Sequence, residues 1–342
     1  MSIKKVARIA GVSTATVSRY LNSPEQVKEN TRSKVQSAID EVGYAPNALA
    51  RNFRRGKTSL VVVVLPQVGD PFLDNVMRGI WRVADEQGYS ILIRDTQSNS
   101  HDFDEFTEMV FSKQADGILL LASISPFSEP EAKRSREKAH PPLVLGLESV
   151  TTELNHFPSV RVDNVAAAAD GTQYLIQLGH ERIGFIAGKP DSLLTHDREK
   201  GYRKAMRKAK LKVENGWVVE GEQTIDGARR ATRRLLAHKQ RPTAIFCAND
   251  EMALGTVHEI KNAGLRVPED ISVVGFDDIR YAEVMDPPLT TIAQPAEEIG
   301  ERTMRRLVQA IDGGALDKDT DTSPEIVPHK LIVRKSTGNA PR

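Results

Sequence analysis

The sequence predicts a small helical headpiece, followed by two lobes of doubly wound α/β structure. Three observations lead to this fold class. Two short apolar helical patterns joined by a glycine occupy residues 2–21. From residue 59 onward, apolar runs alternate with helical patterns, as in layers with parallel sheets. These runs are too many for one sheet, so two α/β lobes are expected.

Residues 2–21 predict a helix, a tight turn and a second helix. Gly11 supplies the permissive backbone that a sharp turn needs, and Ser13 is a natural N-cap for the second helix. The first helix has an apolar stripe with members at i, i+3, i+4 and i+7, namely Ile3, Val6, Ala7 and Ala10. The second helix points Val12, Val17 and Leu21 back at the first.

The outer face of the second helix is small and hydroxylated, and it carries one arginine at its far end. Its members are Thr14, Ala15, Ser18 and Arg19. A helix that enters the major groove of DNA needs such a face, because its first turn must approach base edges without bulk. The alternative is an ordinary pair of surface helices.

A third helix is expected over residues 31–42. Asn30 or Thr31 can cap its start, and Gly43 stands where a left-handed C-cap belongs. Residues 46–57 then combine a proline, helix-forming residues and a terminal glycine. A helix this short is marginal in water, so it should order only when something holds it. We interpret it as a hinge.

The chain from Ser59 onward contains apolar runs typical of buried parallel strands. They are Leu60–Leu65, Ile91–Ile93, Ile118–Leu121, Leu143–Leu147, Ile183–Ala187, Ala244–Cys247 and Ile271–Phe276. Helical patterns lie between most of them, for example Leu73, Val76, Met77, Ile80, Trp81 and Ala84.

The net charge of +1 hides an asymmetry. Residues 1–58 hold 11 Lys and Arg against 4 Asp and Glu, whereas the remainder holds 36 basic and 42 acidic residues. A basic segment at residues 1–58, followed by a mildly acidic remainder, indicates a polyanionic partner for residues 1–58 alone.

The single cysteine, Cys247, excludes an intrachain disulfide and favours the reducing cytoplasm. No apolar leader and no run of membrane-spanning length is present, so neither secretion nor a membrane is expected.

The histidines show no metal-binding spacing, and no nucleophile motif or cofactor loop occurs, so we expect no metal, no cofactor and no enzymatic activity. The basic run from Arg203 to Lys212 is interpreted as a solvated helix face.

Motifs spread over the whole chain carry a resemblance to a known family. They include VARIAGVSTATVSRYLN at 6–22, DGILLL at 116–121, AIFCANDEMALG at 244–255 and PPLTTIAQP at 287–295. With them, the chain resembles the LacI/GalR family of bacterial transcription regulators. The last motif and the PF after DGILLLAS are most similar to the nucleoside-responsive, cytidine-type repressors. The resemblance implies a core like that of periplasmic sugar-binding proteins, with an effector cleft between its lobes.

The resemblance also implies which residues contact DNA. The base-reading positions are Thr14, Ala15 and Arg19, and the phosphate-contacting positions are Ser13, Thr16 and Ser18. An alanine at position 15 leaves little side chain for a polar base contact. In the hinge, Phe53 stands where the family commonly has a leucine that wedges between base pairs, and Arg51, Arg54 and Arg55 flank it. The alternative for Phe53 is a core aromatic.

Four positions match the family's effector contacts: Phe72, Arg198, Asn249 and Asp277. A carboxylate, a guanidinium, an amide and an aromatic face suit a neutral, hydroxyl-rich ligand such as cytidine, another nucleoside or a sugar. Asp277 could instead cap a following helix, and Arg198 could pair with Asp197 or Glu199. Gln223 stands where purine-binding relatives carry an aromatic residue, which argues against a purine.

The expected organisation is a headpiece at 1–45, a hinge helix at 46–58 and two core lobes. The first lobe comprises 59–160 plus 293–322, and the second comprises 161–292 plus 323–342. We expect a cytoplasmic homodimer, because no leucine heptads follow Ile332 to make a tetramerisation tail. Its two-fold symmetry should match a near-palindromic double-stranded operator DNA. The alternatives are a sugar- or nucleoside-binding protein and an α/β enzyme with an accessory DNA-binding head. Whether the effector lowers or raises the affinity of the protein for operator DNA stays open.

Overall fold

The structure is a computed structural model that describes residues 2–44, 57–96, 109–122, 142–147, 157–190, 192–313 and 322–341. The chain divides into two compact units, Met1–Ser59 and Leu60–Arg342. The predicted fold class is confirmed, with a helical first unit and two six-stranded sheets in the second.

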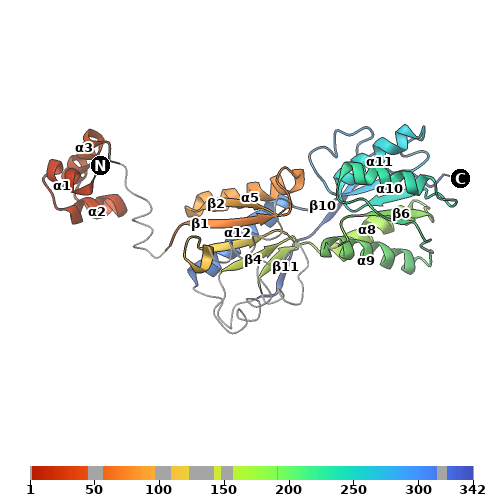
Figure 1. Cartoon of the computed structure of the whole chain (residues 1–342), viewed down its shortest axis with the longest axis horizontal. Coiled ribbons are helices and arrows are strands. Elements are labelled where there is room, and N and C mark those ends of the chain that lie inside the picture. The colour runs from red at the N-terminus through yellow and green to blue at the C-terminus, as the bar shows by residue number, and fades with distance from the viewer. Residues whose placement is uncertain are drawn as a thin grey trace. The chain divides into compact units, whose positions relative to one another are not determined.

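The first unit is a three-helix headpiece, with α1 at Ile3–Ala10, α2 at Thr14–Asn22 and α3 at Glu29–Val42 (Figure 1). A short 3₁₀ turn, η1, spans Pro24–Gln26. The apolar stripes meet in one small core, in which Val6, Val17 and Val35 are completely buried. Burying side chains of this size contributes about 1.5–3 kcal/mol each.

Three of the four predicted helix signals in the headpiece are confirmed. Gly11 has a φ of 63° and Gly43 a φ of 58°, both left-handed, and the Ser13 hydroxyl accepts from the Thr16 N–H at 3.1 Å. The predicted caps Asn30 and Thr31 are wrong, because α3 already begins at Glu29. Its early start follows from the turn before it, where Val27 is buried and its carbonyl accepts from Arg32 Nε at 2.6 Å.

The expected hinge helix falls on residues that the structure does not describe. Residues 45–56 lie outside the described part of the chain, and they include Arg51, Phe53, Arg54 and Arg55. Their proposed DNA contacts therefore stay predictions.

The second unit contains two six-stranded sheets with the same strand order. The first is β11-β5-β4-β3-β1-β2, with β1 at Leu60–Leu65, β2 at Ser90–Asp95, β3 at Gly117–Leu120, β4 at Leu143–Gly146, β5 at Ser159–Arg161 and β11 at Pro324–Ile326. The second is β12-β10-β9-β8-β6-β7, with β6 at Ile183–Ala187, β7 at Val218–Glu220, β8 at Ala244–Cys247, β9 at Ser272–Asp277, β10 at Thr290–Ala293 and β12 at Lys330–Ile332. Among the paired strands, β12 alone runs antiparallel to its neighbour.

Strand β1 shows why these runs are continuously apolar. Val61 and Val63 belong to the cluster on one face of the first sheet, and Val62 and Val64 belong to the cluster on the other face. Successive side chains of a strand point to opposite faces, so a strand buried on both faces needs apolar residues at every position.

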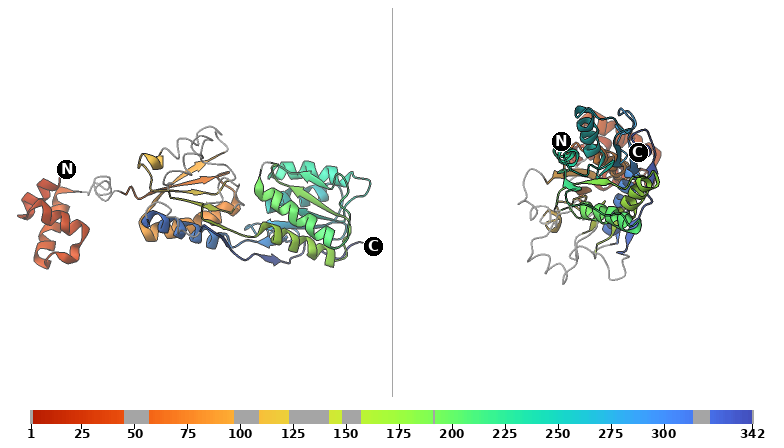
Figure 2. Two further views of the ribbon diagram at one scale, coloured as in Figure 1. Left: turned by 90° about the horizontal axis from the view of Figure 1, so that it is seen from below. Right: turned by 90° about the vertical axis from the view of Figure 1, so that its right-hand side faces the viewer.

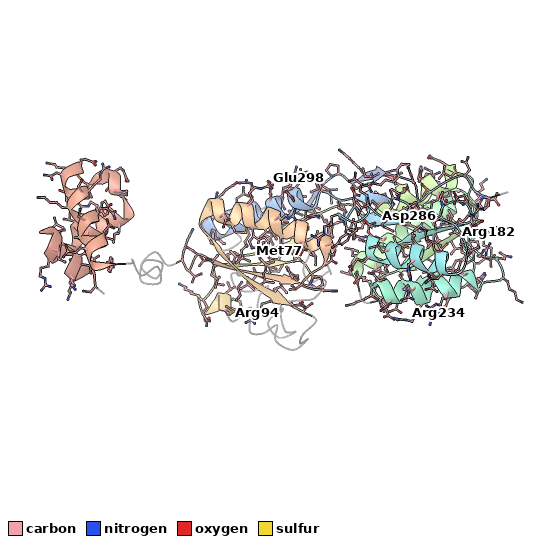
Figure 3. The ribbon with its side chains drawn as sticks, turned by 90° about the horizontal axis from the view of Figure 1, so that it is seen from above. Met77, Arg94, Arg182, Arg234, Asp286 and Glu298 are labelled. Atoms are coloured by element: carbon pink, nitrogen blue, oxygen red, sulfur yellow. The ribbon has the colours of Figure 1, made fainter. Side chains whose placement is uncertain are left out.

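Helices cover both sheets. In the first lobe, α5 at Pro71–Gln87 packs against α12 at Ala296–Asp312, and Figure 2 shows α12, in blue, along one side of the sheet. The two helices cross closely through glycines, since a Cβ on Gly79 would lie 2.0 Å from the Glu297 carbonyl oxygen, and one on Gly300 would lie 2.0 Å from that of Val76. Met77, labelled in Figure 3, is buried in the cluster between α5 and the sheet.

The second sheet lies between two helix pairs, as Figure 1 shows. One pair is α8 at Asn164–Gln177 with α9 at Leu193–Lys208, and the other is α10 at Ile225–Leu236 with α11 at Asp250–Asn262. No helix in the described parts of the chain is both long and apolar enough to cross a membrane.

Two sequence expectations for the core need correction. The predicted division at 322/323 comes one strand too early, because β11 pairs with β5 in the first sheet and only β12 belongs to the second. Trp81 fits the helical apolar pattern but is 45% exposed, since it lies at the edge of the stripe that α5 buries. The strands missed by the sequence prediction are short, with only three or four residues each: β5, β7, β10, β11 and β12.

Candidate functional site

A cleft in the second unit gathers residues that follow the carboxyl ends of strands from both sheets. Its empty space is about 710 Å³, including the opening to solvent. The lining residues are Pro66, Gln67, Asp70, Phe72, Leu73, Leu121, Leu147, Lys189, Leu194, Arg198, Glu222, Gln223, Thr224, Asn249 and Asp277. The strand order reverses direction at β1 in the first sheet and at β6 in the second. Ligands of open α/β sheets bind outside the strand ends at such points.

All four predicted effector residues lie in this cleft: Phe72, Arg198, Asn249 and Asp277. They come from α5 and α9, from the N-cap of α11 and from the end of β9. Tertiary folding therefore brings together four positions that are far apart in the sequence.

Arg198 is the centre of the polar network in the cleft, and it is only 2% exposed. Its Nε donates to Asn164 Oδ1 at 3.0 Å, another nitrogen donates to the Ala248 carbonyl, and Nη2 lies 3.4 Å from Asp277 Oδ1. The guanidinium also stacks on Phe276, with its carbon 3.6 Å from the ring centroid. These contacts fix the planar fork in one orientation, so it can present donors to a ligand without losing side-chain entropy.

Asp277 ends β9 with its carboxylate toward Arg198. Gln294 Nε2 also donates to Asp277 Oδ1, at 2.7 Å. Burial raises the pKa of Asp277 to about 7, against the opposing effect of the Arg198 charge. The alternative role as a helix cap is wrong, because a turn and then β10 follow Asp277.

Asn249 and Phe72 are both held by helix N-termini. Asn249 caps α11: its Oδ1 accepts from the Met252 N–H at 2.9 Å. The cap therefore uses the oxygen of the Asn249 side chain and not its amide nitrogen. Phe72 lies in the first turn of α5, and its N–H donates to Asp70 Oδ1 at 2.8 Å. Phe72 is buried against the first lobe's core and presents only a small part of its surface to the cleft.

The sequence prediction missed several charged residues that line the cleft. Asp70 caps α5, and burial raises its pKa. Lys189 follows β6, and Glu222 follows β7 and pairs with Arg230 at 2.7 Å. With Arg198 and Asp277, three acidic and two basic side chains line the cleft. For Asp70 and Lys189, their position in the segments that follow the predicted strands β1 and β6 was a signal that could have identified them, whereas Glu222 follows β7, which the sequence did not predict.

Strained backbone concentrates at this cleft. Four lining residues other than glycine have positive φ angles: Leu147 at 75°, Glu222 at 58°, Gln223 at 58° and Asp277 at 110°. Such conformations cost on the order of 1–3 kcal/mol each and cluster at functional sites, where the surrounding structure imposes them.

The outer face of α2 in the headpiece is available for contact. Ser13, Thr14, Ala15 and Arg19 are exposed, and Thr16 and Ser18 are half-buried. Ser13 and Thr16 hydroxyls lie 2.9 Å apart, and Tyr20 on the other side donates to Gln36 in α3 at 2.6 Å. The predicted DNA-reading face of α2 is therefore exposed, while the opposite side of α2 contacts α3.

Other features singled out in the sequence have structural explanations. The basic residues of α9, among them Arg203, Lys204, Arg207 and Lys208, are exposed as predicted for a solvated face. Cys247 is buried, and burial raises the pKa of its thiol to about 12. Among the described residues, no group of three or more His, Cys, Asp or Glu side chains could hold a metal ion.

Comparisons with known proteins agree with this arrangement. A family model described as bacterial regulatory proteins, lacI family, matches residues 2–47, and one described as a periplasmic binding protein-like domain matches residues 172–337. The HTH-type transcriptional repressor CytR of Escherichia coli (strain K12) is 39% identical over 340 residues, which cover 99% of this chain and 97% of that protein.

Two solved structures extend the similarity to three dimensions. The Lac repressor dimer bound to operator and the anti-inducer ONPF matches with a TM-score of 0.87 at 27% identity, covering 99% of each chain. The transcriptional regulator CelR in complex with cellobiose matches with a TM-score of 0.73 at 31% identity, covering 98% of this chain and 99% of that one.

Proposed function

The chain belongs to the LacI family of bacterial regulatory proteins, and we propose that a small hydroxyl-rich effector in its cleft controls how tightly it holds operator DNA. The protein is a DNA-binding transcriptional repressor with an effector-binding core. The observation that carries the proposal is the joining, in one chain, of an exposed α2 face and a cleft in which Arg198 and Asp277 converge. Such a regulator acts in the cytoplasm, where bacterial DNA lies.

In this proposal the α2 face reads the operator. Arg19 donates a bidentate pair to a guanine, while Thr14 and Ala15 contact thymine methyl groups. Ser13, Thr16 and Ser18 bind phosphates and fix the register. The Lac repressor dimer supports a homodimer that places two such helices in the half-sites of a near-palindromic operator.

The hinge completes the DNA interface. Phe53 wedges between base pairs in the minor groove, and Arg51, Arg54 and Arg55 bind the backbone beside it. Because Ala15 contributes little direct readout, the wedge and the deformability of the operator supply much of the specificity.

The charge of the cleft favours an uncharged effector. Acidic side chains outnumber basic ones in the cleft by three to two, which favours nucleosides and free sugars over nucleotides and sugar phosphates. Arg198, Asn249 and Asp277 offer donors and acceptors for ribose hydroxyls, and Phe72 offers an apolar edge. We choose cytidine as the first candidate, supported by the resemblance of the PPLTTIAQP motif to the nucleoside-responsive repressors and by Gln223 at the position of a purine-stacking aromatic.

The cleft residues are bonded directly to the segments that cross between the lobes. Arg198 bonds Asn164, which starts α8 just after the first crossing, and Asp277 bonds Gln294, in the second crossing between β10 and α12. An effector that bonds Arg198 and Asp277 therefore favours one lobe arrangement over another. Only this difference in affinity can transmit its presence to the headpieces.

DNase footprinting on the promoter next to the gene, with and without cytidine, tests the proposal. We expect a protected near-palindrome whose protection changes with cytidine and not with cytidine monophosphate. Isothermal titration of the same protein measures effector affinity directly. Absence of any protected site would refute the regulator proposal, whereas protection that responds to cellobiose but not to cytidine would assign a sugar effector, the candidate that the CelR–cellobiose match supports.

A further inference from the structure

We propose that Asp250 is a positioning residue for effector recognition, whose buried carboxylate holds the turn at 277–279 so that Asp277 faces the cleft. The proposal rests on the proposed function, in which Asp277 binds the effector. Asp250 itself does not line the cleft.

Asp250 joins three elements of the second lobe through its two carboxylate oxygens. Oδ2 accepts from the backbone N–H of Ile279 at 2.9 Å, immediately after Asp277 and Asp278. Oδ1 accepts from the hydroxyl of Thr291, on β10, at 2.6 Å. The side chain is completely buried, and it packs so closely on β9 that a Cβ on Gly275 would lie 2.1 Å from Oδ1.

The turn that Asp250 holds is strained and needs such support. Asp277 has a φ of 110° and Asp278 a φ of 55°, conformations that residues with a Cβ rarely adopt. Asp278 is held from its other side by Arg334, whose Nη1 lies 2.7 Å from Oδ1. Strained residues persist only when the surrounding structure over-determines them, and Asp250 supplies the buried part of that support.

An ordinary helix-capping role does not account for this geometry. Asn249 already caps α11 through Met252, and Glu251 also places a negative charge in the first turn. The Asp250 carboxylate is instead committed to Ile279 and Thr291, outside its own helix. Burial and the charge of Asp277 raise the pKa of Asp250 well above the usual range, and the hydrogen bonds from Thr291 and Ile279 oppose that shift.

This reasoning predicts opposite results for two substitutions. In Asp250→Asn, the side-chain oxygen can still accept from the Ile279 N–H, and the amide nitrogen can donate to the Thr291 hydroxyl. In Asp250→Ala both bonds are lost, and the Ile279 N–H is left buried without that partner. Asparagine should therefore preserve effector affinity and alanine should reduce it.

Isothermal titration of the full-length protein with cytidine separates positioning from general destabilisation. We expect Asp277→Asn and Asp250→Ala each to weaken binding by roughly tenfold or more, and Asp250→Asn by less than about threefold. The double variant Asp250→Ala/Asp277→Asn should bind no more weakly than Asp277→Asn alone, because both changes remove the same contact. Thr232→Val is the matched control: Thr232 is completely buried in the same lobe and bonds Ala228 and Thr256, so its loss lowers stability without changing affinity.

Amide hydrogen exchange by mass spectrometry gives a second readout that needs no ligand. We expect peptides over 275–285 to exchange faster in Asp250→Ala, but not in Asp250→Asn, while peptides of α9 stay protected. Equal affinity of Asp250→Ala and wild type, or additive losses in the double variant, would overturn the positioning role. If Asp277→Asn binds like wild type, the proposed effector site fails. If wild type does not bind cytidine, the choice of cytidine fails, and unchanged exchange at 275–285 in Asp250→Ala would separately refute the role of Asp250.

Discussion

Effector binding should depend on pH through Asp277. Its pKa is raised to about 7, chiefly by burial, so the carboxyl titrates within the working range of the protein. The groups around it are Arg198 and Gln294, which bond it, and the carboxyl groups of Asp70 and Asp250, whose pKa values are also raised. In the ionised form both carboxylate oxygens are acceptors, so Oδ2 can accept from a ligand hydroxyl while Oδ1 accepts from Arg198 and Gln294, and we expect cytidine affinity to rise with pH.

The size of the effect follows from the fraction ionised. With a pKa of about 7, roughly 9% of Asp277 is ionised at pH 6 and roughly 91% at pH 8. The apparent dissociation constant scales inversely with the competent fraction, so it should fall about tenfold between these pH values. Titration calorimetry at pH 6, 7 and 8 measures this directly. Asp277→Asn should bind more weakly and with no such slope.

The same titration should act on stability with the opposite sign. The folded-state pKa of about 7 lies above the ordinary value of 3.8, so the folded protein binds the proton more tightly than the unfolded chain does. This stabilising contribution is complete below about pH 3.8 and is lost as the pH rises through 7. Its full loss is on the order of 4 kcal/mol as an upper limit. A wild-type pH slope of cytidine affinity that persists in Asp277→Asn would refute the reasoning.

Three further predictions concern DNA binding and the first lobe. Arg19→Ala should cost about 1–3 kcal/mol per half-site and relax preference at one base pair, as measured by binding to operator variants, and uniform weakening across sequences would reassign Arg19 to a phosphate. Phe53→Ala should weaken operator affinity and reduce bending together in gel-shift phasing assays, whereas unchanged bending would contradict the wedge. Gly300→Ala should lower the free energy of unfolding by about 1–3 kcal/mol or more, because its Cβ would lie 2.0 Å from the Val76 carbonyl; a melting temperature equal to that of wild type would show that α5 and α12 separate easily.

Local patterns predicted much of this protein correctly. The helical stripes of α1 and α2, the turn at Gly11 and the cap at Ser13 follow from spacing and backbone freedom over a few residues. The same holds for long buried strands such as β1, which needs apolar residues on both faces. Strand β10 escaped prediction although β8 is equally short, because β10 begins with two threonines and so does not form a continuous apolar run.

The cleft shows the limit of reasoning from the sequence alone. The family resemblance identified Phe72, Arg198, Asn249 and Asp277, and all four line the cleft. Nothing in the sequence around Asp250 indicated a role for it. Its role emerges only when β9, β10 and α11 pack together, since its partners Ile279 and Thr291 lie 29 and 41 residues away in the chain.

The sequence by itself determined the fold class, because apolar spacing is a local property of the chain. Its resemblance to a family identified four residues that line the cleft, Phe72, Arg198, Asn249 and Asp277, and gave the DNA-reading face as a prediction. Tertiary structure alone decided where the chain crosses between lobes, which side chains are buried and how far burial moves the pKa of Asp277. Burial and long-range hydrogen bonds depend on which surfaces meet. That meeting is a property of the packed chain and not of any one segment.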